Sequence, residues 1–112
     1  MRAKVIVSGA GDWRYIDVVP QGAGKLESLE YLRGRENFAL ERTVACGDSG
    51  NDVLMLSGDN LSVAVGNSQP DLKEWVARQF AVGGAERAQR LLLTKACQAD
   101  GILEGLATYG LL

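Results

Sequence analysis

From residue 42 onward the chain alternates β-rich runs with helical patterns, and this alternation limits the folds it can adopt. Three β-rich runs are each followed by a helical pattern: strands at 42–47, 61–66 and 89–94, and helices at 52–56, from Pro70 onward and at 99–112. Strands that alternate with helices predict a parallel sheet covered by helices, which is an α/β fold. Ligands of such sheets bind at the loops that follow the carboxyl ends of the strands.

The helix expected from Pro70 places Leu72, Trp75, Val76 and Phe80 on one face, which predicts that this face packs on the sheet. The last helix, at 99–112, is weakened by Gly105 and Gly110.

The N-terminal part of the chain has a different pattern. Two β-rich runs, at 3–7 and 13–20, are separated by the turn-forming sequence "SGAGD", which predicts a β-hairpin. Leucines at helical spacing then predict a helix over 24–35, with Gly34 suited to its C-terminal end. We therefore expect a hairpin and a helix before the parallel sheet begins.

Composition excludes several classes of protein. The 112 residues are enough for one domain, and 46% hydrophobic with 23% charged residues is typical of a globular fold. A net charge of −2 gives no basic surface for nucleic acid, and no apolar run is long enough for a membrane span or an export signal. Cys46 and Cys97 do not form a disulfide framework, so we expect reduced thiols in the cytoplasm. The chain has no histidine, which removes the commonest general base.

The loop "GDSGND" after the first parallel strand carries Asp48 and Asp52. Carboxylates at a strand end are suited to Mg²⁺, which binds through one or two carboxylates together with water and substrate phosphate. The same residue types are also typical of a helix start, with Asp48 or Ser49 as N-cap and Asp52 in the first turn. The hexapeptide alone leaves metal binding and helix capping equally open.

Other polar residues are weaker candidates when taken singly. Lys25, at the end of "QGAGK", is placed to neutralise a phosphate, although a lone lysine is more often simply solvated. Asn67 and Ser68 have hydrogen-bonding groups for a phosphate or a metal-bound water, but Asn-Ser before a proline is more often a turn. Three aromatic residues have faces for a sugar ring, yet packing is the commoner use of each: Trp13, Tyr15 and Trp75.

Three segments taken together resemble one family: "PQGAGKLESLEYL", "ACGDSGNDVLML" and "VAVGNSQPDLKEW". Their order and spacing resemble the C-terminal part of haloacid dehalogenase superfamily phosphatases, and in particular the sucrose-phosphate phosphatase-like group. The resemblance runs from about residue 4 to the final helix. It implies the C-terminal half of a Rossmannoid parallel sheet over 20–112, preceded at 1–19 by a hairpin that is the remnant of a cap.

The resemblance also implies roles for individual residues. Lys25 matches the lysine that steadies the phosphoryl group and the nucleophilic carboxylate, so it is the expected catalytic and phosphate-binding cation. Asp48 matches the acid that binds Mg²⁺, and Asp52 matches the acid that supports the metal shell. The loops that contact metal-bound water or phosphate contribute the remaining positions: Ser49 for the metal, and Asn51 and Asn67 for phosphate.

The chain departs from the family in one important respect. The family's nucleophile and its general acid and base lie in a D-x-D-x-[TV] motif, and no D-x-D occurs in these 112 residues. The family's phosphate-binding Ser or Thr motif has no counterpart either. We therefore expect the C-terminal half of a longer phosphatase, inactive alone, whose strand at 43–46 lacks a neighbour that carries the nucleophile.

The function implied is a Mg²⁺-dependent sugar-phosphate phosphatase with sucrose 6-phosphate as the expected substrate. The alternative is a non-catalytic domain that binds a phosphorylated sugar or associates with a sugar-phosphate synthase. The residues that select the sugar are open, and Asp12, Trp13 and Arg14 in the hairpin are candidates.

Overall fold

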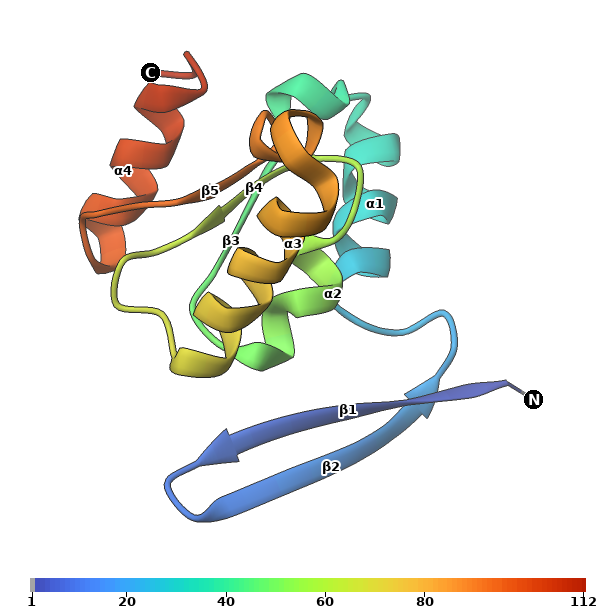
Figure 1. Ribbon diagram of the computed structural model, residues 1–112. Coiled ribbons are helices and arrows are strands. Elements are labelled where there is room, and N and C mark those ends of the chain that lie inside the picture. Colours follow the sequence, from blue (N-terminus) through green and yellow to red (C-terminus); the bar gives the residue numbers. More distant parts are fainter. Residues whose placement is uncertain (1) are drawn as a thin grey trace.

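A β-hairpin and a three-stranded parallel sheet with its helices form the two parts of the fold in a computed structural model of the chain (Figure 1). The structure describes residues 2–112, so Met1 of the proposed cap segment lies outside the described residues. The strands are β1 (Ala3–Ala10), β2 (Trp13–Pro20), β3 (Val44–Gly47), β4 (Leu61–Ala64) and β5 (Leu91–Leu93). The helices are α1 (Lys25–Glu36), α2 (Val53–Leu56), α3 (Pro70–Ala88) and α4 (Gln98–Thr108), with short 3₁₀ turns η1 (Leu40–Arg42) and η2 (Gly50–Asp52).

The predicted hairpin is confirmed, and its first strand is longer than expected. β1 and β2 pair antiparallel from Ala3 opposite Pro20 to Ala10 opposite Trp13. The turn therefore contains only two residues, Gly11 and Asp12, instead of the five-residue loop that the sequence suggested. Gly11 has φ +60°, a conformation that tight hairpin turns need and that glycine adopts at little cost.

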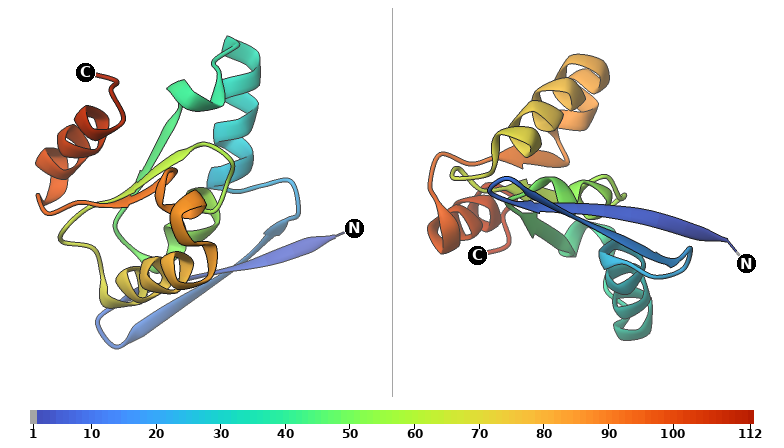
Figure 2. Two further views of the ribbon diagram at one scale, coloured as in Figure 1. Left: turned by 45° about the horizontal axis from the view of Figure 1, so that its top comes forward. Right: turned by 90° about the horizontal axis from the view of Figure 1, so that it is seen from below.

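The predicted parallel sheet is confirmed as well. Its strand order is β3-β4-β5, and both pairings are parallel. α3 and α4 lie on opposite faces of the sheet (Figure 2). Neighbouring β4 residues account for this arrangement, because Ala64 belongs to the core cluster beneath α3 whereas Val63 contacts Gly105 of α4.

The main core lies between the sheet, α2 and α3. It consists of six buried apolar residues: Ala45, Leu56, Ala64, Leu72, Val76 and Leu91. Trp75 and Phe80 are partly buried against this cluster, so the apolar face predicted for α3 is the face that packs. α3 begins with Pro70 in its first turn, as expected, and is interrupted at Gly84, where φ is +54°.

Two helix ends differ from expectation. α1 continues through Gly34 to Glu36, one residue beyond the expected end. Asn37 caps it, because its left-handed backbone (φ 59°) lets its N–H reach the carbonyls of Arg33 and Gly34. α4 ends at Thr108 instead of residue 112, because Gly110 adopts φ +72° and turns the chain.

Gly105 also has a different role from the one expected. A Cβ atom at this position would lie 2.5 Å from Cγ2 of Val63, so the missing side chain allows α4 to approach β4 closely. The sequence suggested that Gly105 weakens the helix, whereas the structure uses it for packing.

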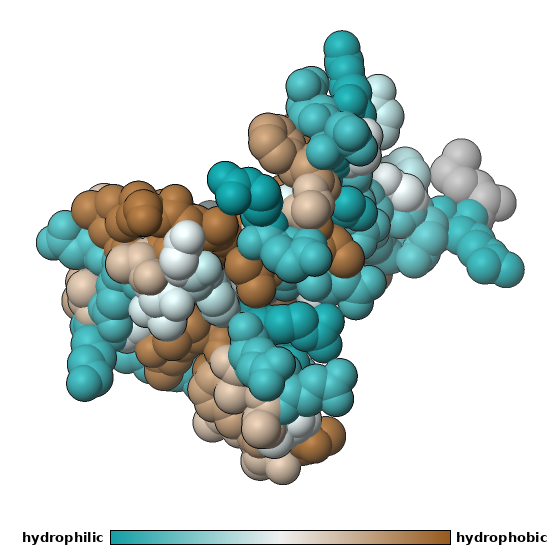
Figure 3. Space-filling model, turned by 90° about the horizontal axis from the view of Figure 1, so that it is seen from above, coloured by the Kyte–Doolittle hydropathy of each residue, from teal (hydrophilic) through white to brown (hydrophobic). Residues whose placement is uncertain are grey.

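Considerable apolar surface remains exposed. Val5, Val7, Ile16 and Val18 share one face of the hairpin, and each is more than half exposed. The space-filling view shows further apolar surface at the α4 end of the molecule (Figure 3). β3 pairs only with β4, so its other edge has no strand partner among residues 2–112. None of the described helices has the length and apolar character that a membrane span requires.

Candidate functional site

The loops after β3 and β4 meet the start of α1 at one end of the sheet. Lys25 is the first residue of α1, and its side chain reaches the loop after β3. The two loops are joined by a backbone hydrogen bond, in which Gln69 N–H donates to Asp48 O at 2.7 Å. The structure therefore brings three of the sequence-predicted segments together at the carboxyl end of the sheet, where α/β folds bind their ligands.

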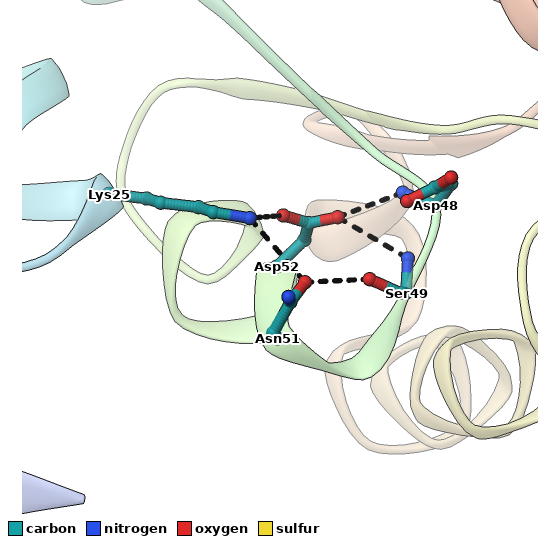
Figure 4. Close-up of polar contacts among 5 residues, drawn as sticks. All are labelled: Lys25, Asp48, Ser49, Asn51 and Asp52. Atoms are coloured by element: carbon teal, nitrogen blue, oxygen red, sulfur yellow. Dashed lines mark hydrogen bonds and ion pairs between the residues drawn. The ribbon is translucent and has the colours of Figure 1, made fainter. Parts of the chain in front are cut away.

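Asp52 is the centre of this cluster (Figure 4). Its side chain is buried, and Oδ1 forms an ion pair with Nζ of Lys25. Oδ2 accepts hydrogen bonds from the backbone N–H groups of Asp48 (3.0 Å) and Ser49 (3.3 Å). Ser49 is the N-cap of η2, so Asp52 has the position that an acid occupies in a capping box. One carboxylate thus fixes both the loop backbone and Lys25.

Gly47 explains how the loop comes so close to the strand end. A Cβ atom at Gly47 would lie 2.6 Å from Cβ of Asp52 and 2.8 Å from its Oδ2. Any side chain at this position would displace Asp52 from the backbone groups that it binds. The last residue of β3 therefore has to be glycine for Asp52 to close the loop.

Asp48 is arranged differently from Asp52. It is exposed, it lies on the far side of Asp52 from Lys25 (Figure 4), and its carboxylate has no hydrogen-bond or ion-pair partner within residues 2–112. Its backbone is held at both ends, because its N–H donates to Asp52 and its carbonyl accepts from Gln69. The result is an available carboxylate on a fixed backbone.

Asn51 and Ser49 connect the loop to Lys25. The Ser49 hydroxyl donates to Asn51 Oδ1 at 2.6 Å, and Lys25 Nζ donates to the same oxygen at 3.4 Å. Half of the Lys25 side chain is exposed, and two of its three N–H donors are used by Asp52 and Asn51, so one donor remains for a ligand. Lys25, Ser49 and Asn51 form one polar cluster with Asp52.

Asn67 does not belong to this cluster. Its Oδ1 accepts a 2.7 Å hydrogen bond from the backbone N–H of Gln98, at the start of α4. Gln98 has φ +52°, so this hydrogen bond helps to hold an unfavourable backbone conformation. Asn67 therefore supports the next loop, with only its amide NH₂ group left for a ligand.

A cleft of about 660 Å³ lies between the hairpin and the part of the fold that contains the parallel sheet and its helices, which we call the sheet domain. Lys25 and Asn51 line it, so it opens directly onto the polar cluster. A smaller lobe of about 360 Å³ continues toward the hairpin turn and is lined by Ser49 and Arg14. Of the aromatic candidates Trp75 lines the cleft, whereas Trp13, Tyr15 and also Asp12 line neither lobe.

Asp71 is a residue that the sequence reasoning missed. It lines both lobes of the cleft and packs so closely on Gly50 that a side chain there would collide with its carboxylate. Asp71 lies within the quoted segment "VAVGNSQPDLKEW", and its position in the first turn of a helix that follows a strand could have singled it out.

The cysteine nearest the site is a weaker nucleophile than an ordinary thiol. Cys46 lies in β3, and burial raises the pKa of its thiol. Because the thiolate is the reactive form, a raised pKa keeps this group unreactive at neutral pH. Cys97 is exposed, and both cysteines are free thiols.

The residues present fit one side of a Mg²⁺ site. Mg²⁺ is bound by one or two carboxylates together with waters and substrate phosphate, and Asp48 supplies one available carboxylate. Asp52 is already paired with Lys25. The part of the chain that the structure describes contains no group of three or more His, Cys, Asp or Glu side chains arranged for a metal ion. A metal here would need ligands from phosphate, water or another polypeptide segment in addition to Asp48.

Comparison with known proteins shows which family the chain is similar to. Residues 1–110 match the protein family described as sucrose-6F-phosphate phosphohydrolase. The chain is 36% identical over 112 residues to sucrose-phosphatase 1 of Nicotiana tabacum, and the match covers 96% of this chain and 24% of that protein. It is 35% identical over 99 residues to a glucosylglycerol-phosphate synthase of Pseudomonas anguilliseptica, with 88% of this chain and 12% of that protein covered.

A solved structure is similar in fold. The sucrose-phosphatase of Synechocystis sp. PCC6803, in complex with sucrose and phosphate, aligns with a TM-score of 0.77 and 29% identity over 96% of this chain and 40% of that chain. This chain thus spans about a quarter of the tobacco relative and less than half of the solved structure. Because the family match covers nearly every residue, the chain belongs to the sucrose-6F-phosphate phosphohydrolase family.

Proposed function

We propose that this chain is the metal- and phosphate-binding half of a Mg²⁺-dependent sugar-phosphate phosphatase, with sucrose 6-phosphate as substrate. The observation that supports this most strongly is the available Asp48 carboxylate beside the Lys25–Asp52 ion pair at the carboxyl end of the sheet. The family name and the relative with bound sucrose and phosphate favour this substrate. The net charge of −2 favours a small substrate over nucleic acid.

The proposal gives each residue a separate task. Asp48 would hold Mg²⁺, with Ser49 beside it on the metal side of the loop and Asp52 in support. Mg²⁺ would supply positive charge next to the phosphoryl oxygens as charge develops there. Lys25 uses the N–H donor that Asp52 and Asn51 leave available to bind the phosphoryl group and to stabilise its charge. Asn51 binds phosphate beside Lys25, and Asn67 borders the site with its amide NH₂ group.

We propose that the nucleophile comes from another polypeptide segment, because no D-x-D motif occurs in this sequence. Its strand would lie parallel to β3, whose outer edge has no partner among the described residues, with 20–112 forming the rest of a Rossmannoid core. The hairpin at 1–19 would belong to a cap, and the exposed apolar face of Val5, Val7, Ile16 and Val18 would pack on the remainder of that cap.

A second candidate function is a non-catalytic domain that binds a phosphorylated sugar or accompanies a sugar-phosphate synthase. The match to a protein named as a synthase supports this candidate, because a similar segment makes up 12% of that longer chain. The two functions differ in whether a nucleophile-bearing segment restores turnover, whereas both require phosphate binding at Lys25.

Ligand binding by the 112-residue chain tests the part of the site that it carries. We expect Mg²⁺ and inorganic phosphate together to raise the free energy of unfolding by about 1.4 kcal/mol when phosphate is tenfold above its Kd. Asp48→Asn should remove the Mg²⁺ dependence of this stabilisation. The matched control is Asp59→Asn, which removes an exposed carboxylate remote from the cleft. No stabilisation at millimolar ligand, or the same stabilisation in Asp48→Asn, would contradict the proposal.

A further inference from the structure

One face of α3 forms a wall of the cleft between the hairpin and the sheet domain. Asp71, Trp75 and Arg78 all line this cleft. They are spaced four and three residues apart, which places them in a row on a single helix face. The cleft also contains Lys25 and Asn51, so the row on α3 extends from the proposed phosphate position along the same cavity.

The Asp71 carboxylate is fixed at the near end of this row. Its Oδ1 accepts a 2.8 Å hydrogen bond from the backbone N–H of Leu72. Its other oxygen lies directly against Gly50, where any side chain would collide with it. Asp71 is exposed and has no cationic partner within residues 2–112, so Oδ2 is available to accept a hydrogen bond from a ligand in the cleft.

The other two members of the row make contacts within α3. The Arg87 guanidinium lies 5.8 Å from the Trp75 ring, so one part of the indole is covered while another part lines the cleft. Arg78 is oriented by Glu74, which accepts a hydrogen bond from Nη1 at 3.1 Å. Across the cleft, β1 and β2 contribute the hydroxyl of Ser8 and the carboxylate of Asp17.

These groups are suited to a neutral polyhydroxylated ligand. Carboxylates accept hydrogen bonds from hydroxyl groups, a guanidinium donates them, and an indole provides an apolar surface for the C–H groups of a ring. Arg78 is already paired with Glu74, so with Asp17 and Asp71 this part of the cleft has no excess positive charge for an additional anion. The phosphate end is different, because Lys25 supplies the positive charge there.

We propose that Asp71, Trp75 and Arg78 of α3 bind the sugar ring of the substrate and select a sugar phosphate over free phosphate. The inference rests on the proposed function in that the phosphate of this substrate lies at Lys25 and Asn51. It adds three sugar-binding residues of α3 to the groups that the hairpin contributes across the cleft, Ser8 and Asp17.

Titration of the ¹⁵N-labelled chain with two separate probes tests the inference. Unphosphorylated sucrose should shift the Trp75 indole N–H and the amide signals near Asp71, and Mg²⁺ with inorganic phosphate should shift the signals of Lys25 and Asn51. Asp71→Asn should weaken sucrose binding about tenfold, as expected for loss of a hydrogen bond to a charged group, and leave phosphate binding unchanged. Arg78→Gln should have the same selective effect.

The matched control is Glu86→Gln, which makes the same change of charge at an exposed position of α3 outside the cleft. Equal sucrose affinity in Asp71→Asn, Arg78→Gln and Glu86→Gln would overturn the inference, as would sucrose-dependent shifts that map away from α3. Loss of the phosphate response alone would count against the proposed function and not against the sugar-binding row, because the two probes report on different residues.

Discussion

At the scale of single residues, the two aspartates of the loop after β3 have different roles. Asp52 is buried and has three partners, since Lys25 and two backbone N–H groups bind its oxygens. Asp48 is exposed and has an available carboxylate. The loop sequence left helix capping and metal binding open for both acids. In our account the two roles are divided, because Asp52 closes the loop and Asp48 is proposed to face the metal.

This division predicts opposite consequences for stability. Asp52→Asn should lower the free energy of unfolding by about 1–3 kcal/mol, because it weakens a partly buried ion pair and leaves Lys25 unpaired. Asp48→Asn should change it by no more than about 0.5 kcal/mol, as is usual for an exposed side chain without partners. Urea denaturation of both variants measures the difference. Equal destabilisation of the two variants would show that the loop does not depend on Asp52.

The residues of the site were predictable to different degrees. Lys25, Asp52 and Asn51 meet in the structure, and the order of the three sequence segments was sufficient to group them. Asn67 was expected at phosphate, but its Oδ1 binds Gln98, a contact across 31 positions that local sequence does not reveal. Asp71 was missed because its importance depends on the close approach of Gly50, which is a tertiary contact.

At the scale of elements, one ion pair connects the hairpin to the first turn of α1. Lys4 on β1 is paired with Glu27, and Lys25 of the site lies two residues before that glutamate. The Lys4 ammonium lowers the pKa of the Glu27 carboxyl below its ordinary value of 4.5. Gly24 has φ +135°, and a side chain there would collide with both partners of the pair. The pair therefore helps to set the position of the cleft wall relative to Lys25.

The Lys4–Glu27 pair predicts a pH-dependent contribution to stability. Because the folded-state pKa of Glu27 is lowered, the stabilisation is present above about pH 4.5 and is lost as the pH falls through the folded-state pKa. Lys4→Met should therefore be less stable than the wild type at pH 7, and the difference should shrink at about pH 3. Urea denaturation at the two pH values measures this.

A charge reversal provides the control for this prediction. The double variant Lys4→Glu with Glu27→Lys restores opposite charges at the two positions, and it should recover part of the stability that Lys4→Met loses. A difference between Lys4→Met and the wild type that is independent of pH would mean that packing of the lysine stem, and not the ion pair, holds the hairpin.

The type and order of the elements followed from the sequence, whereas several boundaries did not. Apolar periodicity located every strand and every helix longer than one turn. The end of α1 lies one residue after the predicted one, and the residue that caps it is Asn37 instead of Gly34. The role of Gly105 could not be read locally, since helix propensity says nothing about the close contact with Val63 on another element.

At the scale of the whole molecule, the fold presents surfaces that fit a larger assembly. β3 has an unpaired edge within residues 2–112, the hairpin has an exposed apolar face, and the site contributes one available carboxylate. All three features fit a partner segment that adds a strand beside β3 and brings the nucleophile to Lys25 and Asp48. The matched relatives are long enough to contain such a segment, since this chain spans only 24% of the tobacco sucrose-phosphatase.

The most direct test is a complementation assay with sucrose 6-phosphate and Mg²⁺, in which phosphate release is measured. We predict no release above background by the 112-residue chain alone, and release once a polypeptide that carries the D-x-D-x-[TV] half of a related sucrose-phosphatase is supplied. Asp48→Ala should abolish the restored activity, whereas the remote control Asp59→Asn should retain it. Robust phosphate release by the chain alone, or restored activity that survives Asp48→Ala, would contradict the account.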